Sequence, residues 1–390
     1  MPQQLAYAIL TPYSLHKSRT GGIIARLITR TGLELIGARM FAPSQELVQK
    51  YAESVVSSND PQDRRIQELI RDYILKNFSP EPKSGRRRRV MVLLFQGEDA
   101  VRKVRAVVGS FSAHRRGGET IRDTYGDLVL DENEAVQYFE PAVLAAPTVD
   151  EAISKLKLWA HYSDSEGGVL ENVIHYAPDE QSERTLVLLK PDNFRFATGR
   201  PGNMIDFFSR TGLFIVGIKV HRMSTAQAIE FYGPVREVLR NKLKGVVATR
   251  AKEALEKEFG FPIPGSEERQ LGELLGPLLG ENQFENIVRF MSGRGPSECE
   301  PALMTQPGTE KCIALIYEGA NAVAKIRDVL GPTDPTKAPP GSIRREFGSN
   351  IMVNAAHASD SADNARREMR IVNVGENNFR QVIEDFYGQV

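Results

Sequence analysis

The stretches "GGIIARLITRTGLELIG" (21–37) and "PGNMIDFFSRTGLFIVG" (201–217) are two versions of one sequence, 180 positions apart. The positions of the first stretch that recur unchanged in the second are Gly22, Arg30, Thr31, Gly32, Leu33 and Gly37. Each stretch is typical of an amphipathic helix that ends at Thr-Gly and is followed by a strand, because its apolar residues first recur at helical spacing and then run together. The chain therefore contains this helix–strand unit twice.

A second pair of blocks extends the repeat to whole domains. "LLFQGEDAVRKVRAVVG" (93–109) matches "LIYEGANAVAKIRDVLG" (315–331), and the offset grows from 180 to 222, so the later copy carries about 42 extra residues between its two blocks. Blocks that recur in the same order indicate tandem homologous domains. We expect a first copy at 1–161, a linker at 162–183, and a second copy at 184–390 with an insert at about 234–283.

Each copy has the element order of a known architecture. A short β-rich run ("LAYAIL" or "TLVLLK") is followed by the helix–strand unit, a variable helical stretch, a strand, a helix, a long loop, a weak strand and a final helix. This β-α-β, helices, β-α-β order predicts two tandem ferredoxin-like (split βαβ) α+β sandwich domains. The insert is dense in Lys, Glu, Arg and Leu and should be mostly helical; it is either a solvated helical extension or a lid or oligomer contact.

Composition excludes several classes of protein. Of the 390 residues, 41 % are hydrophobic, which is ordinary for globular domains, and 50 basic residues balance 50 acidic ones. With no net charge there is no long-range field toward nucleic acid or a membrane surface, and no apolar run approaches membrane-spanning length. Two cysteines exclude a disulfide framework and a cysteine-based zinc site. A cytoplasmic location is the default expectation.

One basic run departs from this even distribution. Arg86 to Arg89 directly precede the apolar segment "VMVLLF". We interpret the run mainly as the solvated start of a strand, with contact to a phosphate as the second interpretation.

His357 lies in "NAAHASDSADNA" (354–365) without an apolar stripe to pack on. Asp360 and Ser361 are good N-cap residues, so His357 should lie just before a helix N-terminus, where the helix dipole favours an anion such as phosphate. Glu368, two turns into that helix, can hold one ring nitrogen and leave the other as a nucleophile. An imidazole with an ordinary pKa of about 6.5 is largely neutral near pH 7. We expect the buried side of this helix to comprise Ala362, Ala365 and Met369.

Polar and cationic residues of the second copy complete a candidate anion site. Guanidinium groups offer planar forks that suit phosphate oxygens, and a lysine at a strand end can point toward an anion. No P-loop, dinucleotide-binding glycine fingerprint or H-E-x-x-H metal motif is present. The candidates are Lys190, Arg327, Thr333, Arg344 and Asn354.

Together these residues carry a resemblance to a family. The segment Asn354-Ala-Ala-His357-Ala-Ser359-Asp360-Ser361 resembles the N-x-x-H-[GA]-S-D-[SA] signature of nucleoside diphosphate kinases. The likeness extends through "RTLVLLKPD", "SRTGLFIVG", "IYEG", "VLGPTDP" and "PPGSIRREFG", covering about 184–222 and 311–371. Two departures are the alanine after the histidine, where glycine is usual, and "MVN" in place of Gly-Arg before the asparagine.

The resemblance implies a reaction and a set of roles. It implies transfer of the γ-phosphate of a nucleoside triphosphate to a nucleoside diphosphate, in a ping-pong reaction through phospho-His357, with Mg²⁺ on the nucleotide. It assigns Ser359 and Glu368 to orienting the imidazole, and the candidate anion-site residues to phosphates and sugar. It assigns Tyr232 in "FYGP" as a lid tyrosine and Phe284 in "NQFENIV" as a base-stacking aromatic. Nucleoside di- and triphosphates and a homo-oligomer are the implied partners. The alternative is a nucleotide-binding regulatory or scaffold protein with little turnover, since the insert alters the lid region.

The first copy lacks the residues on which this chemistry depends. Leu144 aligns with His357, and a leucine cannot accept a phosphoryl group. Pro141 aligns with Asn354 and Thr11 with Lys190. Phe111 aligns with Thr333 and Lys155 with Glu368. The arginines Arg105 and Arg122 are retained. We therefore expect a degenerate kinase-like domain that is structural and pairs with the second copy.

Overall fold

The computed structural model of the chain describes residues 3–58, 60–111, 117–177 and 179–390. It divides into two compact units, one formed by 1–220 together with 313–390, the other by 221–312. Both copies of the repeat contribute to the first unit, whereas the second unit consists of the insert and its flanks. The domain boundaries expected from the repeat, 1–161 and 184–390, therefore stay a proposal.

The first copy and the linker contain eight helices and six strands within the described residues. The strands are β1 (Gln3–Leu10), β2 (Glu34–Phe41), β3 (Val90–Glu98), β4 (Asp127–Leu130), β5 (Val136–Glu140) and β6 (Val143–Leu144). The helices are α1 (Pro12–His16), α2 (Thr20–Thr31), α3 (Gln45–Val55), α4 (Arg64–Asn77), α5 (Ala100–Val108), α6 (Ile121–Tyr125), α7 (Val149–His161) and α8 (Ser163–Glu166).

The second copy has four strands and seven α-helices in the part of the chain that the structure describes. The strands are β7 (Glu183–Leu189), β8 (Phe214–His221), β9 (Cys312–Gly319) and β10 (Ala356–Ala358). The helices are α9 (Arg200–Ser209), α10 (Thr225–Phe259), α11 (Gly265–Ser292), α12 (Ala322–Leu330), α13 (Ile343–Phe347), α14 (Ala362–Val372) and α15 (Asn378–Tyr387), with short 3₁₀ turns at Pro191–Asn193, Pro301–Leu303 and Pro335–Lys337.

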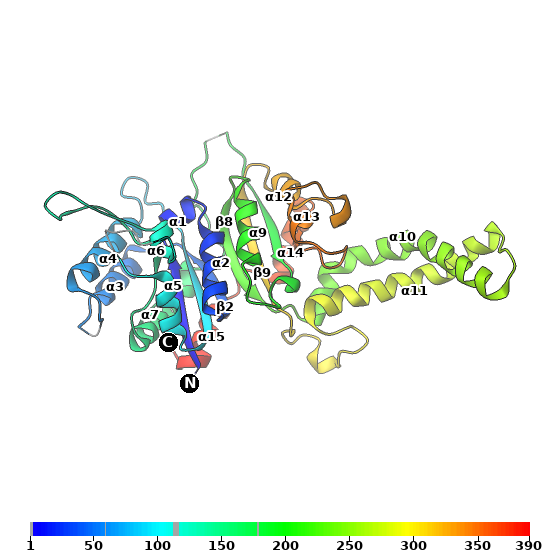
Figure 1. Ribbon diagram of the computed structural model, residues 1–390, viewed down its shortest axis with the longest axis horizontal. Helices are drawn as coiled ribbons and strands as arrows, with labels where there is room; N and C mark the ends of the chain where they lie inside the picture. The colour runs from blue at the N-terminus through cyan, green and yellow to red at the C-terminus, as the bar shows by residue number, and fades with distance from the viewer. Residues whose placement is uncertain (1–2, 59, 112–116, 178) are drawn as a thin grey trace. The chain divides into compact units, whose positions relative to one another are not determined.

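The two sheets have the same topology. The first runs β2-β3-β1-β6 and the second β10-β7-β9-β8, so in each copy the first strand lies between the third and the last (Figure 1). A β4–β5 hairpin is added in the first copy only. The expected pair of ferredoxin-like α+β domains is confirmed, because each sheet carries the split βαβ order with its two crossover helices.

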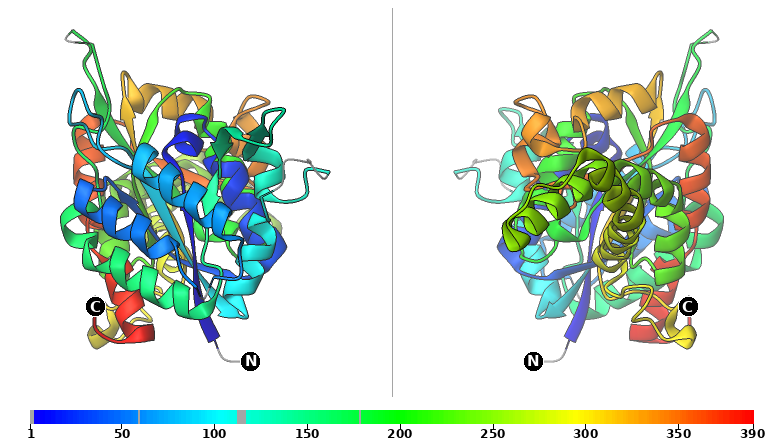
Figure 2. Two further views of the ribbon diagram at one scale, coloured as in Figure 1. Left: turned by 90° about the vertical axis from the view of Figure 1, so that its left-hand side faces the viewer. Right: turned by 90° about the vertical axis from the view of Figure 1, so that its right-hand side faces the viewer.

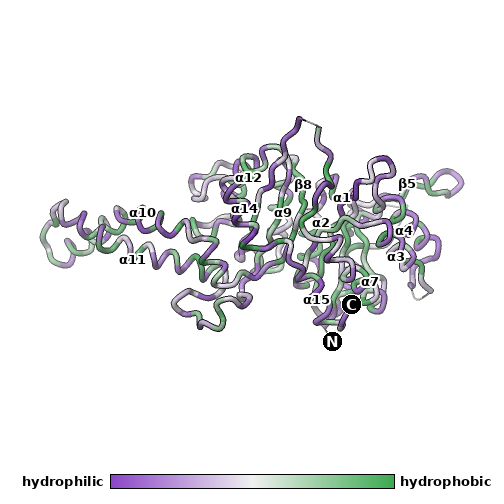
Figure 3. Tube along the Cα trace, turned by 180° about the vertical axis from the view of Figure 1, so that it is seen from behind, coloured by the Kyte–Doolittle hydropathy of each residue, from purple (hydrophilic) through white to green (hydrophobic). Residues whose placement is uncertain are grey.

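The hydrophobic pattern explains these elements. Six consecutive residues from Val90 to Phe95 are buried in β3, as expected for the continuous apolar run "VMVLLF". Helix α2 ends where Gly32 takes the left-handed conformation (φ 63°), which costs glycine little. Aromatic rings fill the space behind the first sheet, where Phe41 and Trp159 pack edge to face at 4.9 Å. Figure 3 shows the hydrophobic residues concentrated along the sheet strands.

Helices α2 and α9, which are equivalent in the repeat, pack against each other and join the two copies (Figure 1). Their backbones approach so closely that a Cβ atom on Gly21 would lie 2.2 Å from the carbonyl oxygen of Gly202. Only glycine fits such an approach. The Asp206 carboxylate of α9 accepts a hydrogen bond of 3.2 Å from the backbone N–H of Gly22 at the start of α2. The predicted pairing of the copies therefore has a physical basis within this unit.

A second contact between the copies holds the segment before α15. Arg39 of β2 donates to the carbonyl oxygens of Ser163 (3.1 Å), Glu376 (3.0 Å) and Gly375 (3.3 Å). Its repeat equivalent, Lys219, donates to the backbone of the same segment and forms an ion pair of 2.5 Å with Glu376. Equivalent cations of the two sheets thus fix one loop of the second copy, and α15 then packs on α7 and β2.

Two sequence interpretations need correction. The run Arg86 to Arg89 is not uniformly solvated, because Arg89 is half-buried and donates to the Ile215 carbonyl (2.6 Å). The buried side of α14 is formed by Ala365, Glu368, Ile371 and Val372, while Ala362 and Met369 are only half-buried. Glu368 turns inward because its carboxylate has partners there.

The second unit is built around a helical hairpin, α10 and α11, whose paired long helices are seen in the right-hand view of Figure 2. Three glycines four residues apart bring the helices together; at Gly276 a Cβ atom would lie 2.9 Å from the Lys244 Cα. Ion pairs cross the seam, among them Arg236–Glu281 at 2.6 Å and Lys252–Glu268 at 3.1 Å. Across the described ranges, no helix combines the length and apolarity needed to cross a bilayer.

Candidate functional site

The strand pairing places His357 opposite the first strand of its own copy. In the second sheet His357 pairs with Leu188 of β7, the second-to-last residue of that strand. In the first sheet Leu144 pairs with Ile9 of β1, again the second-to-last residue. The register therefore confirms that Leu144 occupies the backbone position of His357.

The imidazole of His357 is held by the Glu368 side chain of α14, which also bonds to Ser359 before that helix. Its Nε2 lies 2.9 Å from Glu368 Oε2, and the Ser359 hydroxyl donates to the same oxygen at 2.6 Å. Since a carboxylate accepts, Nε2 carries the proton and Nδ1 keeps its lone pair. The His357 side chain is 21 % exposed, whereas Glu368 is 6 % exposed. The geometry is that of an oriented imidazole with a nucleophilic nitrogen.

Lys190 and Asn354 lie beside this imidazole on neighbouring strand ends. Lys190 follows the last residue of β7, and its ammonium donates to the Asn354 side-chain oxygen at 2.6 Å. The Asn354 amide in turn donates to the backbone carbonyl of Thr333 at 3.1 Å. Between Asn354 and His357, Ala355 takes a positive φ of 70°, which turns the chain into β10. The site therefore joins three segments distant in sequence.

Arg344 supports the backbone from the other side. Its guanidinium donates to the carbonyls of Gly331 (3.0 Å) and Ala356 (3.2 Å), next to His357. Arg327 is exposed on α12 and contributes to lowering the Asp360 pKa, after the larger effect of the Asn364 hydrogen bond. Lys190 and Arg344 thus lie against the segment that carries His357, and Arg327 acts electrostatically on Asp360 three residues after it.

Burial adjusts the protonation of two groups next to one another. Loss of solvent, and after it the like charge of Arg344, lower the pKa of Lys190 to about 8, while Asp192 opposes both effects. Burial raises the pKa of Asp192, against the attraction of Lys190 and Arg200. At neutral pH Lys190 is therefore still mainly an ammonium and can meet a phosphate.

Three supporting residues were missed by sequence reasoning. The buried Asn193 amide donates to the carbonyls of Lys190 (2.9 Å) and Ala355 (2.7 Å), so it ties both halves of the site together. Arg200 donates to the Asn193 side-chain oxygen (3.2 Å) and lies 3.6 Å from Asp192. The only feature of the sequence that pointed to Asp192 and Asn193 is that they lie within three residues of Lys190 in "KPDN".

Tyr232 and Phe284 belong to the second unit and are buried within it. Tyr232 packs against Phe231 with ring centroids 4.9 Å apart, and the Phe284 ring lies 5.2 Å from the Arg236 guanidinium. Phe284 is 3 % exposed, so in this conformation it offers little surface to a base. Their assignment as lid and base-stacking residues stays a prediction.

The corresponding place in the first copy is filled by its own side chains. Glu140 accepts hydrogen bonds from Thr11 (3.0 Å), Tyr73 (2.6 Å) and the backbone of Ala142 (2.9 Å). Burial raises the Glu140 pKa, and these three hydrogen bonds oppose the rise. The Phe111 ring, at the position of Thr333, lies over a guanidinium at 3.7 Å. Thr11 and the Glu140 carboxyl group thus stand where the second copy has Lys190, and the Phe111 ring covers the retained Arg122.

Comparison with known proteins agrees with the repeat. The sequence model of the family described as nucleoside diphosphate kinase matches residues 4–137 and 271–376 of this chain. The nucleoside diphosphate kinase of Staphylothermus marinus is 30 % identical over 191 residues, which is 49 % of this chain and 92 % of that protein. The one of Wolinella succinogenes is 32 % identical over 187 residues, 48 % of this chain and 92 % of that protein.

Among solved structures, a crystal structure of an NDP kinase from Pyrobaculum aerophilum is similar at 27 % sequence identity and a TM-score of 0.34. The match covers 49 % of this chain and 95 % of that chain. The curated relatives thus correspond to about half of this chain, as a single copy of a tandem repeat would.

Proposed function

The chain belongs to the nucleoside diphosphate kinase family, and we propose that its second copy transfers the γ-phosphate of a nucleoside triphosphate to a nucleoside diphosphate through a phosphohistidine at His357. The observation that carries this proposal is the His357–Glu368–Ser359 arrangement, with Nε2 bonded to the carboxylate at 2.9 Å. This arrangement fixes both the tautomer and the orientation of the ring. Broad acceptance of bases is expected, because the residues in the described site offer groups for phosphates and not for base edges.

The reaction proceeds in two balanced half-reactions at one site. The Nδ1 lone pair of His357 forms a bond to the γ-phosphorus while the bond to the bridging oxygen breaks, and the nucleoside diphosphate leaves with that electron pair. An incoming diphosphate then attacks the phosphohistidine with a terminal β-phosphate oxygen, and Nδ1 regains its lone pair. The Glu368 carboxylate stabilises the positive charge that the ring carries between these steps.

Positioning and charge account for most of the expected rate. Phosphoryl transfer requires an in-line arrangement and neutralisation of the equatorial oxygens, and little other covalent chemistry. Lys190, Arg327 and Arg344 supply the positive charge, and the Thr333 hydroxyl supplies a donor, while Asn354 positions Lys190 through its side-chain oxygen. Arg344 also braces the carbonyl of Ala356, so its substitution affects both binding and geometry.

Magnesium is expected to arrive on the phosphates of the nucleotide. Around His357 the side chains are mainly ammonium, guanidinium and hydroxyl groups, which suit phosphate oxygens and not a metal ion. Among the described residues, no three His, Cys, Asp or Glu side chains cluster so that they could hold a metal ion. The described residues therefore provide no metal-binding site of their own, and the metal ion would be held by the nucleotide phosphates.

Labelled ATP tests this proposal directly. Incubation with γ-labelled ATP should give an acid-labile, alkali-stable phosphoprotein that a second nucleoside diphosphate discharges. The His357→Ala variant should remain unlabelled, whereas His221→Ala, a histidine in β8, should be labelled like the wild type. A wild type without label, or a labelled His357→Ala protein, would contradict the proposal.

A second candidate function is a nucleotide-binding regulatory or scaffold protein with little turnover. The burial of Tyr232 and Phe284 in the second unit favours it, because a lid that offers no surface to a base would slow exchange. The same labelling experiment separates the two, since a scaffold binds nucleotide without forming a discharged phosphoprotein. Assembly into a homo-oligomer is part of the leading proposal, and light scattering gives the mass that tests it.

A further inference from the structure

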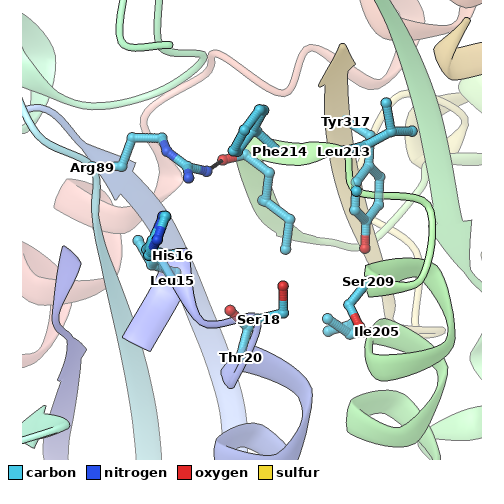
Figure 4. Close-up of a pocket in the computed structure, with 12 residues that line it drawn as sticks. Leu15, His16, Ser18, Thr20, Arg89, Ile205, Ser209, Leu213, Phe214 and Tyr317 are labelled. Carbon is cyan, nitrogen blue, oxygen red and sulfur yellow. Dashed lines mark hydrogen bonds between the residues drawn. The ribbon is translucent and has the colours of Figure 1, made fainter. Parts of the chain in front are cut away.

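A cavity of about 180 Å³ lies between the two copies, away from His357 (Figure 4). Its walls come from α1 and the start of α2 in the first copy, and from α9, β8 and β9 in the second. This volume corresponds to roughly six water molecules, taking about 30 Å³ for each. The cavity is therefore large enough for a small metabolite.

The hydroxyl group of Tyr317 points into this space from β9 (Figure 4). Tyr317 is 1 % exposed, and its hydroxyl has no hydrogen-bond partner among the described residues. Buried hydroxyls almost always have partners, so this one requires an occupant. Burial, and then Asp206, raise the Tyr317 pKa well above its usual value, so the hydroxyl keeps its proton and acts as a donor.

The repeat shows that this hydroxyl is not needed for folding. The matching position of the first copy is Phe95, which is equally buried in β3 and carries no hydroxyl. The same scaffold thus tolerates a phenylalanine at this place in the sheet. The tyrosine adds a polar group that packing alone does not explain.

The opposite side of the cavity is cationic. Arg89 and His16 line it there, across from Tyr317 and Ser209 (Figure 4). Arg89 donates to the Ile215 carbonyl at 2.6 Å and lies 5.1 Å from the Phe214 ring centroid. None of the described residues gives it an ion pair, and none of the residues that line the cavity is acidic. The Glu318 charge reaches Arg89 electrostatically but forms no ion pair with it, so a half-buried guanidinium at the cavity wall favours an anion.

Apolar side chains line the cavity beside both polar ends. Leu15 lies next to His16, and Leu213 and Ile205 lie next to Tyr317 and Ser209 (Figure 4). A ligand that fills the cavity therefore has an oxyanion at one end, a hydrogen-bond acceptor at the other and a short apolar part between. Inorganic phosphate has no such apolar part.

We propose that this cavity is a binding site for a small organic carboxylate that carries a hydroxyl or keto oxygen a few bonds away. The carboxylate pairs with Arg89 beside His16, and the second oxygen accepts from Tyr317. Both copies contribute walls, so occupancy links the degenerate first copy to the second. The site is independent of the proposed phosphotransfer.

Ligand-observed saturation-transfer NMR on the full chain tests the site, with 3-hydroxybutyrate as the probe and butyrate as its matched control. The wild type should bind 3-hydroxybutyrate several-fold more tightly than butyrate. The Tyr317→Phe variant should bind both equally, because only the donor to the second oxygen is lost. The Arg89→Met variant should bind both roughly tenfold more weakly or worse, because the charge-assisted bond to the carboxylate is lost.

Controls separate this site from the rest of the protein. Arg86→Met changes an arginine of the same run that does not line the cavity, and should bind like the wild type. ADP and inorganic phosphate should not displace 3-hydroxybutyrate. Failure of the wild type to bind, displacement by ADP, or an unchanged preference in Tyr317→Phe would each overturn the proposal. Because phenylalanine already occupies position 95 of the first copy, a folding defect of Tyr317→Phe is not expected to obscure the result.

Discussion

In the second copy the end of the first strand carries Lys190 and pairs with a strand that presents His357; in the first copy the same strand end carries Thr11 and pairs with Leu144. The two copies have the same backbone conformation here, and even individual hydrogen bonds recur in both. Arg122 donates to the carbonyls of Gly109 and Val143, just as Arg344 donates to those of Gly331 and Ala356. The turn before the last strand has a positive φ in both copies, at Ala142 (58°) and Ala355 (70°).

This comparison separates scaffold from chemistry. Features present in both copies, such as the arginine brace and the positive-φ alanine, belong to the fold, because the first copy keeps them without a nucleophile. Features of the second copy alone, such as Lys190, His357 and Glu368, are those to which we assign the proposed phosphoryl transfer. Sequence exchanges between the copies can therefore break the comparison or sharpen it.

The largest effect is expected from exchanging the residues at the histidine position. His357→Leu, which introduces the residue of the first copy, should lower phosphotransfer by roughly a thousandfold or more, because the covalent step is lost. The reciprocal Leu144→His should leave activity unchanged and add no second labelled site, because Glu140 and Thr11 do not attract a phosphate. Steady-state transfer from ATP to GDP measures the first effect, and labelling stoichiometry measures the second. A second equivalent of label in the Leu144→His protein would show that the site of the first copy is still competent.

The next effect is expected at the strand end. Lys190→Thr should lower kcat/KM by roughly a hundredfold, since a cation close to the transferred phosphate is replaced by a hydroxyl. The fold should persist, because Thr11 occupies the same position in the first copy. The matched control Lys325→Thr, on the exposed side of α12, should change kcat/KM less than about twofold. A Lys190→Thr protein with normal kcat/KM would exclude contact between this lysine and phosphate.

Removing the contacts that Arg39 and Lys219 make with the loop before α15 (the loop clamp) should lower stability. Arg39→Met loses three charge-assisted hydrogen bonds to carbonyls and should lower the free energy of unfolding by about 1–3 kcal/mol, because the buried Ser163 carbonyl loses its donor while Gly375 and Glu376 are exposed to solvent. Lys219→Met, at the equivalent position, should have a similar effect. Urea unfolding followed by circular dichroism measures both, with Arg102→Met, an exposed arginine, as the control expected to change little. If Arg39→Met were as stable as the control, the first copy would not hold this loop.

The site and the fold differed in how far they could be predicted from sequence. The element order and the sheet topology followed from the repeat, because apolar periodicity and Thr-Gly helix ends are local signals. The alignment also placed Leu144 opposite His357. Glu368 was predicted to reach the ring because it lies two turns into the helix that His357 precedes.

What sequence could not supply depended on contacts between distant segments. Arg89 looks like a solvated member of a basic run, and only the approach of Ile215 and Phe214 from the other copy buries it. Asn193 gave no motif, since its role depends on the carbonyl of Ala355, 162 residues away. The buried side of α14 was assigned by apolarity alone, so Ala362 and Met369 were named in place of Ile371 and Val372.

A smaller effect is expected from pH. Lys190 has a pKa of about 8, lowered first by burial and then by Arg344, and binds phosphate in its protonated form. The protonated fraction therefore falls as pH rises through 8, and kcat/KM should drop by roughly tenfold between pH 7 and 9. Lys190→Arg keeps its charge over this range and should show a flat profile at a lower absolute rate. A wild-type profile that stays flat to pH 9 would show that another group carries the charge.

The smallest effect concerns the α2–α9 contact that joins the copies. Burial raises the pKa of Asp206 to about 6, and hydrogen bonds from the backbone of Gly22 and Gly21 oppose the rise. A carboxyl whose pKa is higher in the folded than in the unfolded state binds its proton more tightly when folded, so its stabilising effect is complete below about pH 4 and is lost as pH rises through 6. Asp206→Asn should therefore flatten the pH dependence of Tm between pH 4 and 7. The corresponding change in the free energy of unfolding is on the order of 1 kcal/mol, because the carboxyl group is partly exposed. The exposed Asp363→Asn is the matched control. Parallel Tm profiles for wild type and Asp206→Asn would mean that this carboxylate is not desolvated, and that the copies are held by the glycine contact and the loop clamp alone.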